Sequence, residues 1–364
     1  MFEIPKYTPP DFSGDFFRDA PDVTTADVER DGVAPEGYHA TSMYPEYYKI
    51  GGEWTLMTGS RMDCVPVIRT DGAIKAVEFR HLKAGDKVVL GRTDDGSRGI
   101  FLYSTGFDTK EESNGDTFAF RTGRNRETSF ASDYEKLYSV LKHDRDKGHI
   151  VWVLGPAAIF DRTSREAMEY IVSNGYCHAV FGGNAVATHD LEGAMFRTAL
   201  GLNLDTGENV HNGHYHHLDL LNRVAGEGSI PKAIDKYGLE GGLITSCVKH
   251  GVPFVLAGSL RDDGPLPEVI SNMGEAQDHM REHTSRATTV ICLATQLHSI
   301  ATGNITPCFV STRDGVRPVF IFSVDVSEFA LDKLRDRGTL EVTTIVSNIQ
   351  DFLFKITSML RDSE

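Results

Sequence analysis

From His149 to the C-terminus, short apolar runs alternate with longer segments in which apolar residues recur at helical spacing. Uninterrupted apolar runs are typical of strands buried on both faces of a parallel sheet, and amphipathic helices cover those faces. The pattern therefore predicts an α/β fold built on a parallel sheet. The predicted strands span residues 150–154, 179–181, 253–257, 289–293, 319–324 and 342–346. The predicted helices span residues 164–173, 217–225, 268–282, 327–337 and 349–360.

The first 130 residues follow a different pattern. Short strand-like runs separated by turns rich in Asp and Gly predict a small antiparallel β-domain over residues 41–130, with a polar loop at 111–129. Residues 1–40 are rich in Pro, Asp and Gly, and we expect an extended arm that docks on a neighbouring subunit of a homo-oligomer. Residues 131–364 form the third predicted unit, which opens with a helix over residues 133–147. The predicted strands of the β-domain span residues 64–68, 74–79, 87–90 and 100–103.

Composition excludes several classes of function. The net charge is −15, and no Lys/Arg cluster of the kind that binds nucleic acid is present. No apolar stretch approaches the roughly 18 residues of a membrane span, and the N-terminus lacks the basic and apolar regions of a secretory signal. The five cysteines are scattered without C-x-x-C spacing, which favours free thiols and a cytoplasmic location.

Glycine-rich or acidic residues follow several predicted strands. Gly155 and Pro156 follow the first, and residues 182–185 follow the second. Glycine lets a backbone approach a phosphate closely, although neither stretch has the G-x-G-x-x-G spacing of dinucleotide sites, and turn glycines explain them equally well. Asp325 closes a later strand, where an acid either accepts hydrogen bonds from a ribose or caps the next helix.

Two other strand ends carry denser polar groups. Ser259, Arg261, Asp262 and Asp263 follow strand 253–257, and the alternative to a functional role is a solvated turn in which Arg261 pairs with either aspartate. Thr295, His298 and Asn304 follow strand 289–293, and His298 alone is as compatible with a helix-packing role as with a functional one. Because these segments share the carboxyl edge of one sheet, we expect them to line one cleft.

Four histidines crowd residues 211–217, at positions 211, 214, 216 and 217. Three interpretations stay open, namely a metal site, an exposed loop and an active-site loop whose histidines transfer protons. The metal interpretation lacks both a partner cysteine motif and H-E-x-x-H spacing, so no metal ligands are assigned.

From about residue 40 onward, the chain resembles the archaeal-type NAD-dependent ornithine cyclodeaminase family, also called the LOR/SDH-type family. That family includes the C-terminal domain of bifunctional arginine dihydrolase/ornithine cyclodeaminases. The resemblance covers long stretches in a single order, among them Phe181-Gly182-Gly183-Asn184-Ala185 and Gly213-His214-Tyr215-His216-His217. The remaining matches are residues 52–54, 62–64, 186–192, 253–267, 276–278, 293–304, 324–325 and 336–338.

The chain departs from the family at three places. Residues 1–40 are too short to supply the additional N-terminal domain that family members usually carry. Gln296 replaces a common leucine or methionine, and Val326-Ser327-Glu328 replaces Ile-Asn-Pro. The alternatives are therefore an NAD-dependent dehydrogenase or cyclase of another amino acid, and an NAD-binding sensor without turnover.

The resemblance implies a Rossmann-like NAD-binding sheet and a redox-neutral cyclisation. NAD⁺ takes a hydride from Cα of L-ornithine, the δ-amine attacks the imine, ammonia leaves, and the returned hydride gives L-proline. On this basis we expect the following residues to bind NAD: Gly155, Pro156, Asn184, Ala185, Thr295, Leu297 and Asp325. We expect these to surround the amino-acid substrate: His189, Asp190, His216, Arg261, Asp262, Asp263, His298 and Asn304. Among them, Arg261 is suited to a carboxylate and Asp263 to the δ-ammonium.

Overall fold

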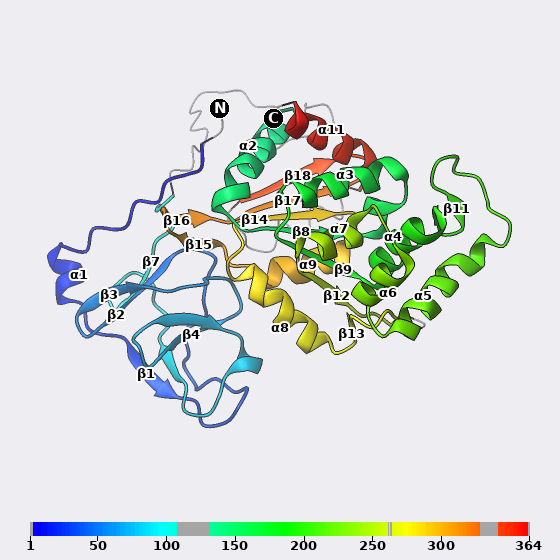
Figure 1. The fold of residues 1–364 in the computed structure, drawn as a ribbon. Coiled ribbons are helices and arrows are strands. Elements are labelled where there is room, and N and C mark those ends of the chain that lie inside the picture. Colours follow the sequence, from blue (N-terminus) through cyan, green and yellow to red (C-terminus); the bar gives the residue numbers. More distant parts are fainter. Residues whose placement is uncertain (1–2, 108–130, 261, 263, 328–340, 363–364) are drawn as a thin grey trace.

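The structure is a computed structural model that describes residues 3–107, 131–260, 262, 264–327 and 341–362. Figure 1 shows an N-terminal β region beside an α/β region in which helices cover both faces of a central sheet. The part of the chain from 108 to 130 lies outside the described residues, as does most of the predicted helix at 327–337.

The N-terminal β region consists of two small antiparallel sheets. One has the strand order β1-β6-β4-β5 and the other the order β3-β2-β7. Val65, Val67 and Val88 are fully buried between the elements of the first sheet. The strands are β1 (Thr24–Asp27), β2 (Glu46–Ile50), β3 (Glu53–Leu56), β4 (Val65–Ile68), β5 (Ile74–Val77), β6 (Lys87–Leu90) and β7 (Ile100–Leu102).

Part of the first 40 residues packs against this β region. β1 pairs with β6, and the short helix α1 (Asp15–Asp19) precedes it. The ring of Phe12 stacks on that of Trp54, with 4.8 Å between centroids and 7° between planes. Lys49 donates hydrogen bonds to three carbonyl oxygens of residues 17, 18 and 20. This segment is therefore anchored on the same chain.

The α/β region contains a seven-stranded sheet with the order β13-β12-β9-β8-β14-β17-β18, and every neighbouring pair is parallel. This confirms the parallel sheet predicted from the apolar runs. The strands are β8 (Ile150–Leu154), β9 (Ala179–Gly183), β12 (Phe254–Ala257), β13 (Val269–Ile270), β14 (Thr289–Leu293), β17 (Phe320–Asp325) and β18 (Glu341–Val346).

Two apolar clusters fill the two faces of this sheet. Trp152 and Leu154 of β8 point into one cluster, and Val151 and Val153 point into the other, because successive side chains of a strand alternate between faces. The described helices are α2 (Ala131–Lys147), α3 (Arg162–Ser173), α4 (Asn184–Phe196), α5 (His216–Glu227), α6 (Ile230–Tyr237), α7 (Leu243–His250), α8 (Met273–Thr284), α9 (Gln296–Ile305) and α11 (Ile349–Arg361). Two short hairpins complete the fold, β10 (Thr198–Ala199) with β11 (Leu202–Asn203) and β15 (Phe309–Thr312) with β16 (Gly315–Pro318).

A buried ion pair joins α2 to the hairpin β15–β16. Asp144 is fully buried and accepts a hydrogen bond of 2.7 Å from Nη1 of Arg317. The hydroxyls of Thr288 and Thr289 donate to the other carboxylate oxygen, at 2.6 and 2.7 Å. Burial alone would raise the pKa of Asp144, but Arg317, Thr288 and His143 hold it below its usual value. The carboxylate is therefore charged and fully hydrogen-bonded.

Three histidines meet at the amino end of the sheet. The ring of His149 stacks on that of His283, with 5.7 Å between centroids, and lies 5.5 Å from that of His178. Nδ1 of His178 accepts a hydrogen bond from the backbone N–H of Ile150 at 3.0 Å, so this nitrogen carries no proton. Burial, the Arg286 guanidinium and the neighbouring histidines lower the pKa of His149 to about 3.

We predict that this cluster makes stability fall in mild acid. The unfolded chain protonates His149 near pH 6.5, whereas the folded chain does not until about pH 3. Its contribution is therefore complete above pH 6.5 and is lost toward pH 3, at up to about 1.4 kcal/mol per pH unit. His149→Phe keeps a flat ring and should make the free energy of unfolding in urea less dependent on pH between 7.5 and 5. An unaltered decline in this variant, or the same flattening in the exposed control His250→Gln, would contradict the assignment.

Candidate active site

The strand order reverses between β8 and β14, since the chain continues from β8 to one side of the sheet and from β14 to the other. In open α/β sheets, ligands bind beyond the carboxyl ends of the strands at such a point. Here the two loops touch through their backbones. The N–H of Gly155 donates to the carbonyl of Leu293 at 2.8 Å, and a Cβ on Gly155 would lie 1.9 Å from the carbonyl oxygen of Ala294. Only glycine fits at position 155.

The segment after β14 brings His298 to the end of β9. Thr295 precedes α9, and its hydroxyl lies 3.2 Å from Nδ1 of His298. A Cβ added to Gly183 would lie 3.2 Å from Cε1 of the same ring. Burial lowers the pKa of His298, and the charge of Asp262 acts in the opposite direction. Ala294 has a φ of +49°, which is unusual for a residue with a side chain and occurs often at functional sites.

Other residues predicted to bind NAD lie along this edge. Pro156 begins a 3₁₀ turn after β8, and Leu297 on the first turn of α9 is 73% exposed. Ala185, on the first turn of α4, is also exposed. Asp325 ends β17, and its Oδ1 accepts a hydrogen bond of 2.9 Å from the N–H of Ser327.

The side chain of Asn184 forms a hydrogen bond with the loop that follows β12. Its Oδ1 accepts a hydrogen bond of 3.0 Å from the N–H of Leu266. Asp262 belongs to the same loop and accepts a hydrogen bond of 2.7 Å from the N–H of Ser259. The other two members of the predicted cluster, Arg261 and Asp263, lie outside the described residues.

A buried carboxylate joins the two histidine segments that the sequence analysis selected. Oε2 of Glu192 lies 3.0 Å from Nδ1 of His189, one turn earlier on α4. Its Oε1 accepts a hydrogen bond of 2.8 Å from the hydroxyl of Thr198, and that hydroxyl lies 2.8 Å from Nδ1 of His216. Because the single hydroxyl proton of Thr198 goes to Glu192, the Nδ1 of His216 must be the donor to Thr198. Both histidines therefore hold a proton on Nδ1, so Nε2 is the nitrogen of each ring through which a proton can be exchanged.

The surroundings of Glu192 keep it charged. The N–H groups of Leu200 and Gly201 also donate to it, at 3.2 and 3.1 Å. Burial alone would raise the pKa of Glu192, but the bonds from His189, Gly201 and Thr198 hold it below its usual value. The sequence analysis placed Glu192 in a matching stretch without selecting it as a site residue. The available signal was its spacing of three residues from His189 on one helix.

This histidine network extends toward the end of β8. The His189 ring centroid lies 5.8 Å from that of Phe160, which follows the turn after β8. The His217 ring lies 6.4 Å from His189, and its Nδ1 is buried without a hydrogen-bond partner among the described residues. A buried donor or acceptor of this kind is stabilised when a ligand or water pairs with it.

Two predicted substrate residues lie apart from this network. Asp190 is fully buried, pairs with Arg165 at 3.0 Å and accepts hydrogen bonds from the first N–H groups of α7. Asn304 lies near the end of α9, and its carbonyl accepts a hydrogen bond from Arg61 of the N-terminal β region. Within the ranges that the structure describes, no three His, Cys, Asp or Glu side chains lie close enough together to hold a metal ion. Within the same ranges, no helix has the length and apolar character needed to cross a membrane.

Comparisons with known proteins place the chain in a family. Residues 135–356 match the family described as arginine dihydrolase ArgZ-like, C-terminal, Rossmann fold. An ornithine cyclodeaminase of Methanopyrus kandleri is 36% identical over 335 residues, which cover 91% of this chain and 76% of that protein.

Two solved structures extend this similarity to the fold. A conserved LOR/SDH protein from Methanococcus maripaludis has a TM-score of 0.84 at 31% identity, covering 94% of this chain and 99% of that one. AgrE in its ternary complex with ornithine and NAD⁺ has a TM-score of 0.59 at 31% identity, covering 95% of this chain and 46% of that one. The chain belongs to the ArgZ-like C-terminal Rossmann-fold family, which it shares with ornithine cyclodeaminases.

Proposed function

We propose that this enzyme is an NAD-dependent ornithine cyclodeaminase, which converts L-ornithine to L-proline and ammonia. The similarity to ornithine cyclodeaminases and to AgrE bound to ornithine and NAD⁺ supports the substrate and the cofactor. The observation that carries the proposal is the Glu192 carboxylate, which orients His189 and His216 beside the carboxyl edge of a Rossmann-like sheet.

The carboxyl edge of the sheet is the expected place for NAD, because the strand order reverses there between β8 and β14. We propose that NAD lies along Gly155, Pro156, Asn184, Ala185, Thr295, Leu297 and Asp325. When bound, NAD supplies the chemistry of hydride removal from Cα and hydride return. Asp325 would accept hydrogen bonds from ribose hydroxyls.

The histidines would handle the protons. An amino group attacks or leaves only in the right protonation state, so a cyclodeaminase needs bases near the α- and δ-nitrogens. The Nδ1 atoms of His189 and His216 are engaged by Glu192 and Thr198, so Nε2 is the atom of each ring that would take up a proton. His298, whose pKa is lowered by burial, is a further neutral base at the end of β9.

The loop after β12 would bind the charged ends of the substrate. Asp262 lies close enough to His298 for its charge to act on that ring. We propose that Arg261 binds the α-carboxylate and that Asp263 holds the δ-ammonium, since a guanidinium and a carboxylate match those groups. Asp190 and Asn304 would contribute indirectly, through the buried pair with Arg165 and the contact with Arg61.

The test is turnover with NAD⁺ and L-ornithine. We expect ammonia and L-proline in equal amounts, with no rise in NADH absorbance, because the hydride returns to the product. Steady accumulation of NADH would instead indicate a dehydrogenase. NAD binding without turnover of any amino acid in a substrate screen would indicate a sensor.

The described residues also support two properties of the whole protein. Five buried cysteines are free thiols, which is consistent with a reducing compartment such as the cytoplasm. Leu200, Tyr215 and Leu218, close to the histidine network, are at least half exposed. Such apolar exposure is typical of a subunit contact, so we propose a homo-oligomer that uses this face.

A further inference from the structure

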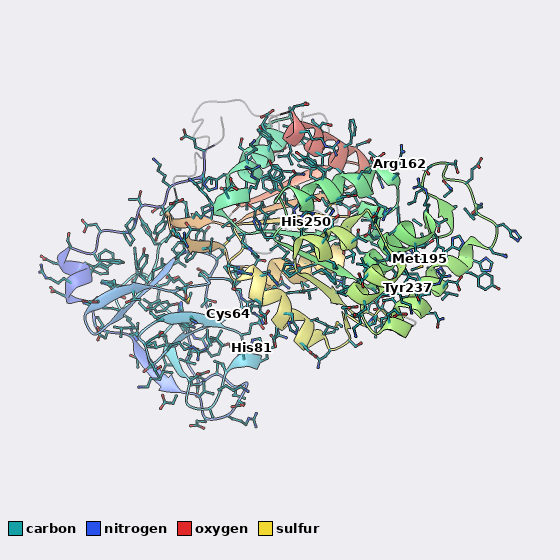
Figure 2. The ribbon with its side chains drawn as sticks, in the orientation of Figure 1. Cys64, His81, Arg162, Met195, Tyr237 and His250 are labelled. Atoms are coloured by element: carbon teal, nitrogen blue, oxygen red, sulfur yellow. The ribbon has the colours of Figure 1, made fainter. Side chains whose placement is uncertain are left out.

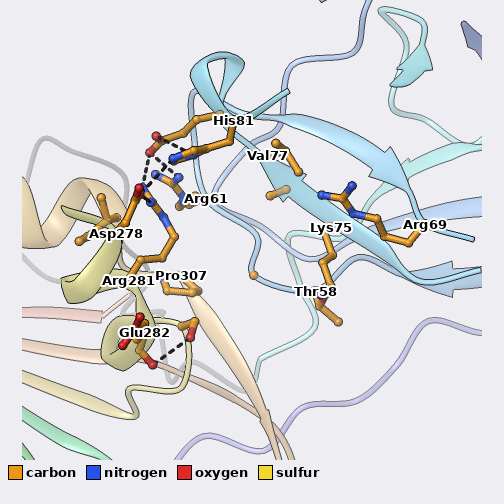
Figure 3. Close-up of a pocket in the computed structure, with 15 residues that line it drawn as sticks. Thr58, Arg61, Arg69, Lys75, Val77, His81, Asp278, Arg281, Glu282 and Pro307 are labelled. Carbon is orange, nitrogen blue, oxygen red and sulfur yellow. Dashed lines mark hydrogen bonds and ion pairs between the residues drawn. The ribbon is translucent and has the colours of Figure 1, made fainter. Parts of the chain in front are cut away.

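A cavity lies between the N-terminal β region and α8, and we call it the α8 cleft. Its volume is about 610 Å³, which is in the range of small-molecule sites. Figure 3 shows side chains of α8 on one side and those of the β4–β5 hairpin on the other. In Figure 2, Cys64 and His81 mark the side of the β region that faces α8. Ile305 and Pro307 line the cleft and lie at the C-terminal end of α9, whereas Thr295 of the candidate active site lies at its N-terminal end. The cleft is therefore separate from the candidate active site.

Part of the charge in the cleft is used to hold the two regions together. Glu78 pairs with Arg61 at 2.5 Å, Arg80 at 2.6 Å and Arg281 of α8 at 3.0 Å. Burial alone would raise the pKa of Glu78, but Arg61 and the other guanidinium groups lower it to about 2. Nε2 of His81 lies 3.0 Å from Asp278 of α8. Glu78, Arg61 and Arg281 therefore have a structural role, because they hold α8 against the N-terminal β region.

Three other charged side chains that line the cleft do not join the two regions and are exposed to solvent. Lys75 is exposed and forms no ion pair with another described residue. Arg69 uses one nitrogen on Asp86, at 2.9 Å, and its side chain is 37% exposed. On the α8 side, Glu282 is 69% exposed, and its one ion pair within the described ranges is a 3.8 Å contact with His279. Lys75 and Arg69 of the hairpin therefore lie on the opposite side of the cleft from Glu282 of α8 (Figure 3).

We propose that the α8 cleft is a second ligand site, which binds a free amino acid with a cationic side chain. The α-carboxylate would pair with Lys75 and Arg69, and the side-chain cation with Glu282. The exposed carboxylate of Glu282 disfavours a second anionic group of the ligand at its end of the cleft, because like charges repel in a partly enclosed site. A ligand in this position contacts both regions and so stabilises their arrangement. The proposal does not depend on the cyclodeaminase activity.

The test uses L-arginine, with glycine as the comparison. We expect L-arginine to bind saturably by calorimetry and to raise Tm, whereas glycine lacks the second cation and should bind weakly. Glu282→Gln and Lys75→Met should each weaken L-arginine binding about tenfold, the usual effect of losing a charged hydrogen-bond partner. Two matched controls lie outside the cleft, Glu275→Gln on the same helix and Lys87→Met on β6, and both should bind like the wild type.

Active-site binding is separated by Arg261→Met, which removes the side chain proposed for the substrate carboxylate and does not change a residue of the cleft. Retained L-arginine affinity in this variant supports the cleft. Loss of affinity in Arg261→Met together with wild-type affinity in both cleft variants would overturn the proposal. The absence of saturable binding up to a concentration on the order of 10 mM would overturn it as well.

Discussion

Glu192→Gln should reduce the kcat of ornithine conversion by about 10²–10⁴-fold, the usual effect of losing effective acid–base catalysis. The carboxylate now accepts from His189 on one oxygen and from Thr198 on the other. An amide has one acceptor oxygen and a nitrogen that only donates, so one of these two donors loses its acceptor. If His189 loses its acceptor, the proton on its own Nδ1 is no longer fixed. If Thr198 loses its acceptor, its hydroxyl can turn, and the proton on Nδ1 of His216 is no longer fixed. In either case the Nε2 atom of that histidine is no longer held as a base. Measurement of ammonia release under saturating substrate tests this expectation.

Two further measurements separate this role from a structural one. The affinity for NAD⁺ and the circular dichroism spectrum should be close to those of the wild type, because Glu192 is not among the proposed NAD contacts. Glu208→Gln, an exposed carboxylate in the same part of the chain, should leave kcat unchanged. A kcat within a few-fold of wild type in folded Glu192→Gln would remove the histidine network from the mechanism.

Asp144→Ala should lower the free energy of unfolding by about 3–5 kcal/mol, the largest stability effect that we expect from one substitution. The change leaves the guanidinium of Arg317, itself only 6% exposed, buried without its carboxylate. It also removes the acceptor for two threonine hydroxyls at the start of β14. Urea unfolding followed by circular dichroism measures the loss.

Asp146→Ala is the matched control, because Asp146 lies on the same helix with a 70% exposed side chain. Its effect should stay within about 1 kcal/mol, as for other surface ion pairs. Replacing both partners with apolar residues, as in Asp144→Leu/Arg317→Met, should recover part of the loss. If Asp144→Ala were as stable as Asp146→Ala, the pair would have no structural role.

The parallel sheet could be predicted because its strands are uninterrupted apolar runs. The predicted strands at 150–154 and 289–293 coincide with β8 and β14. The helix α4 gave no such signal, since it is buried over residues 186–193 and has no continuous polar face. The predicted helix at 268–282 begins later, at Met273, because Asn272 caps it and residues 269–270 form β13 instead. A two-residue edge strand is too short for periodicity to reveal.

The site could be predicted only as a set of residue types at strand ends. His298 and Gly155 lie at the carboxyl edge of the sheet, because a strand end places the residues that follow it there, and their roles stay predictions. Asp190 was selected from the family resemblance, and its buried pair with Arg165, 25 residues earlier in the chain, could not be predicted from any local sequence pattern. Glu192 was not selected because its contact with Thr198, and through Thr198 with His216, depends on a turn and a hairpin that the sequence pattern did not predict.

The place of β8 in the sheet has a consequence for the order of folding. β8 lies at the centre of the sheet and leaves the ribosome before any other of its strands. One edge is paired early by β9, whereas the other must wait for β14, since the contact between His149 and Thr288 spans 139 positions. At typical rates of synthesis this interval is roughly 7–28 s. During that time an apolar central strand has an open edge, so we expect this chain to need chaperone protection early in its synthesis.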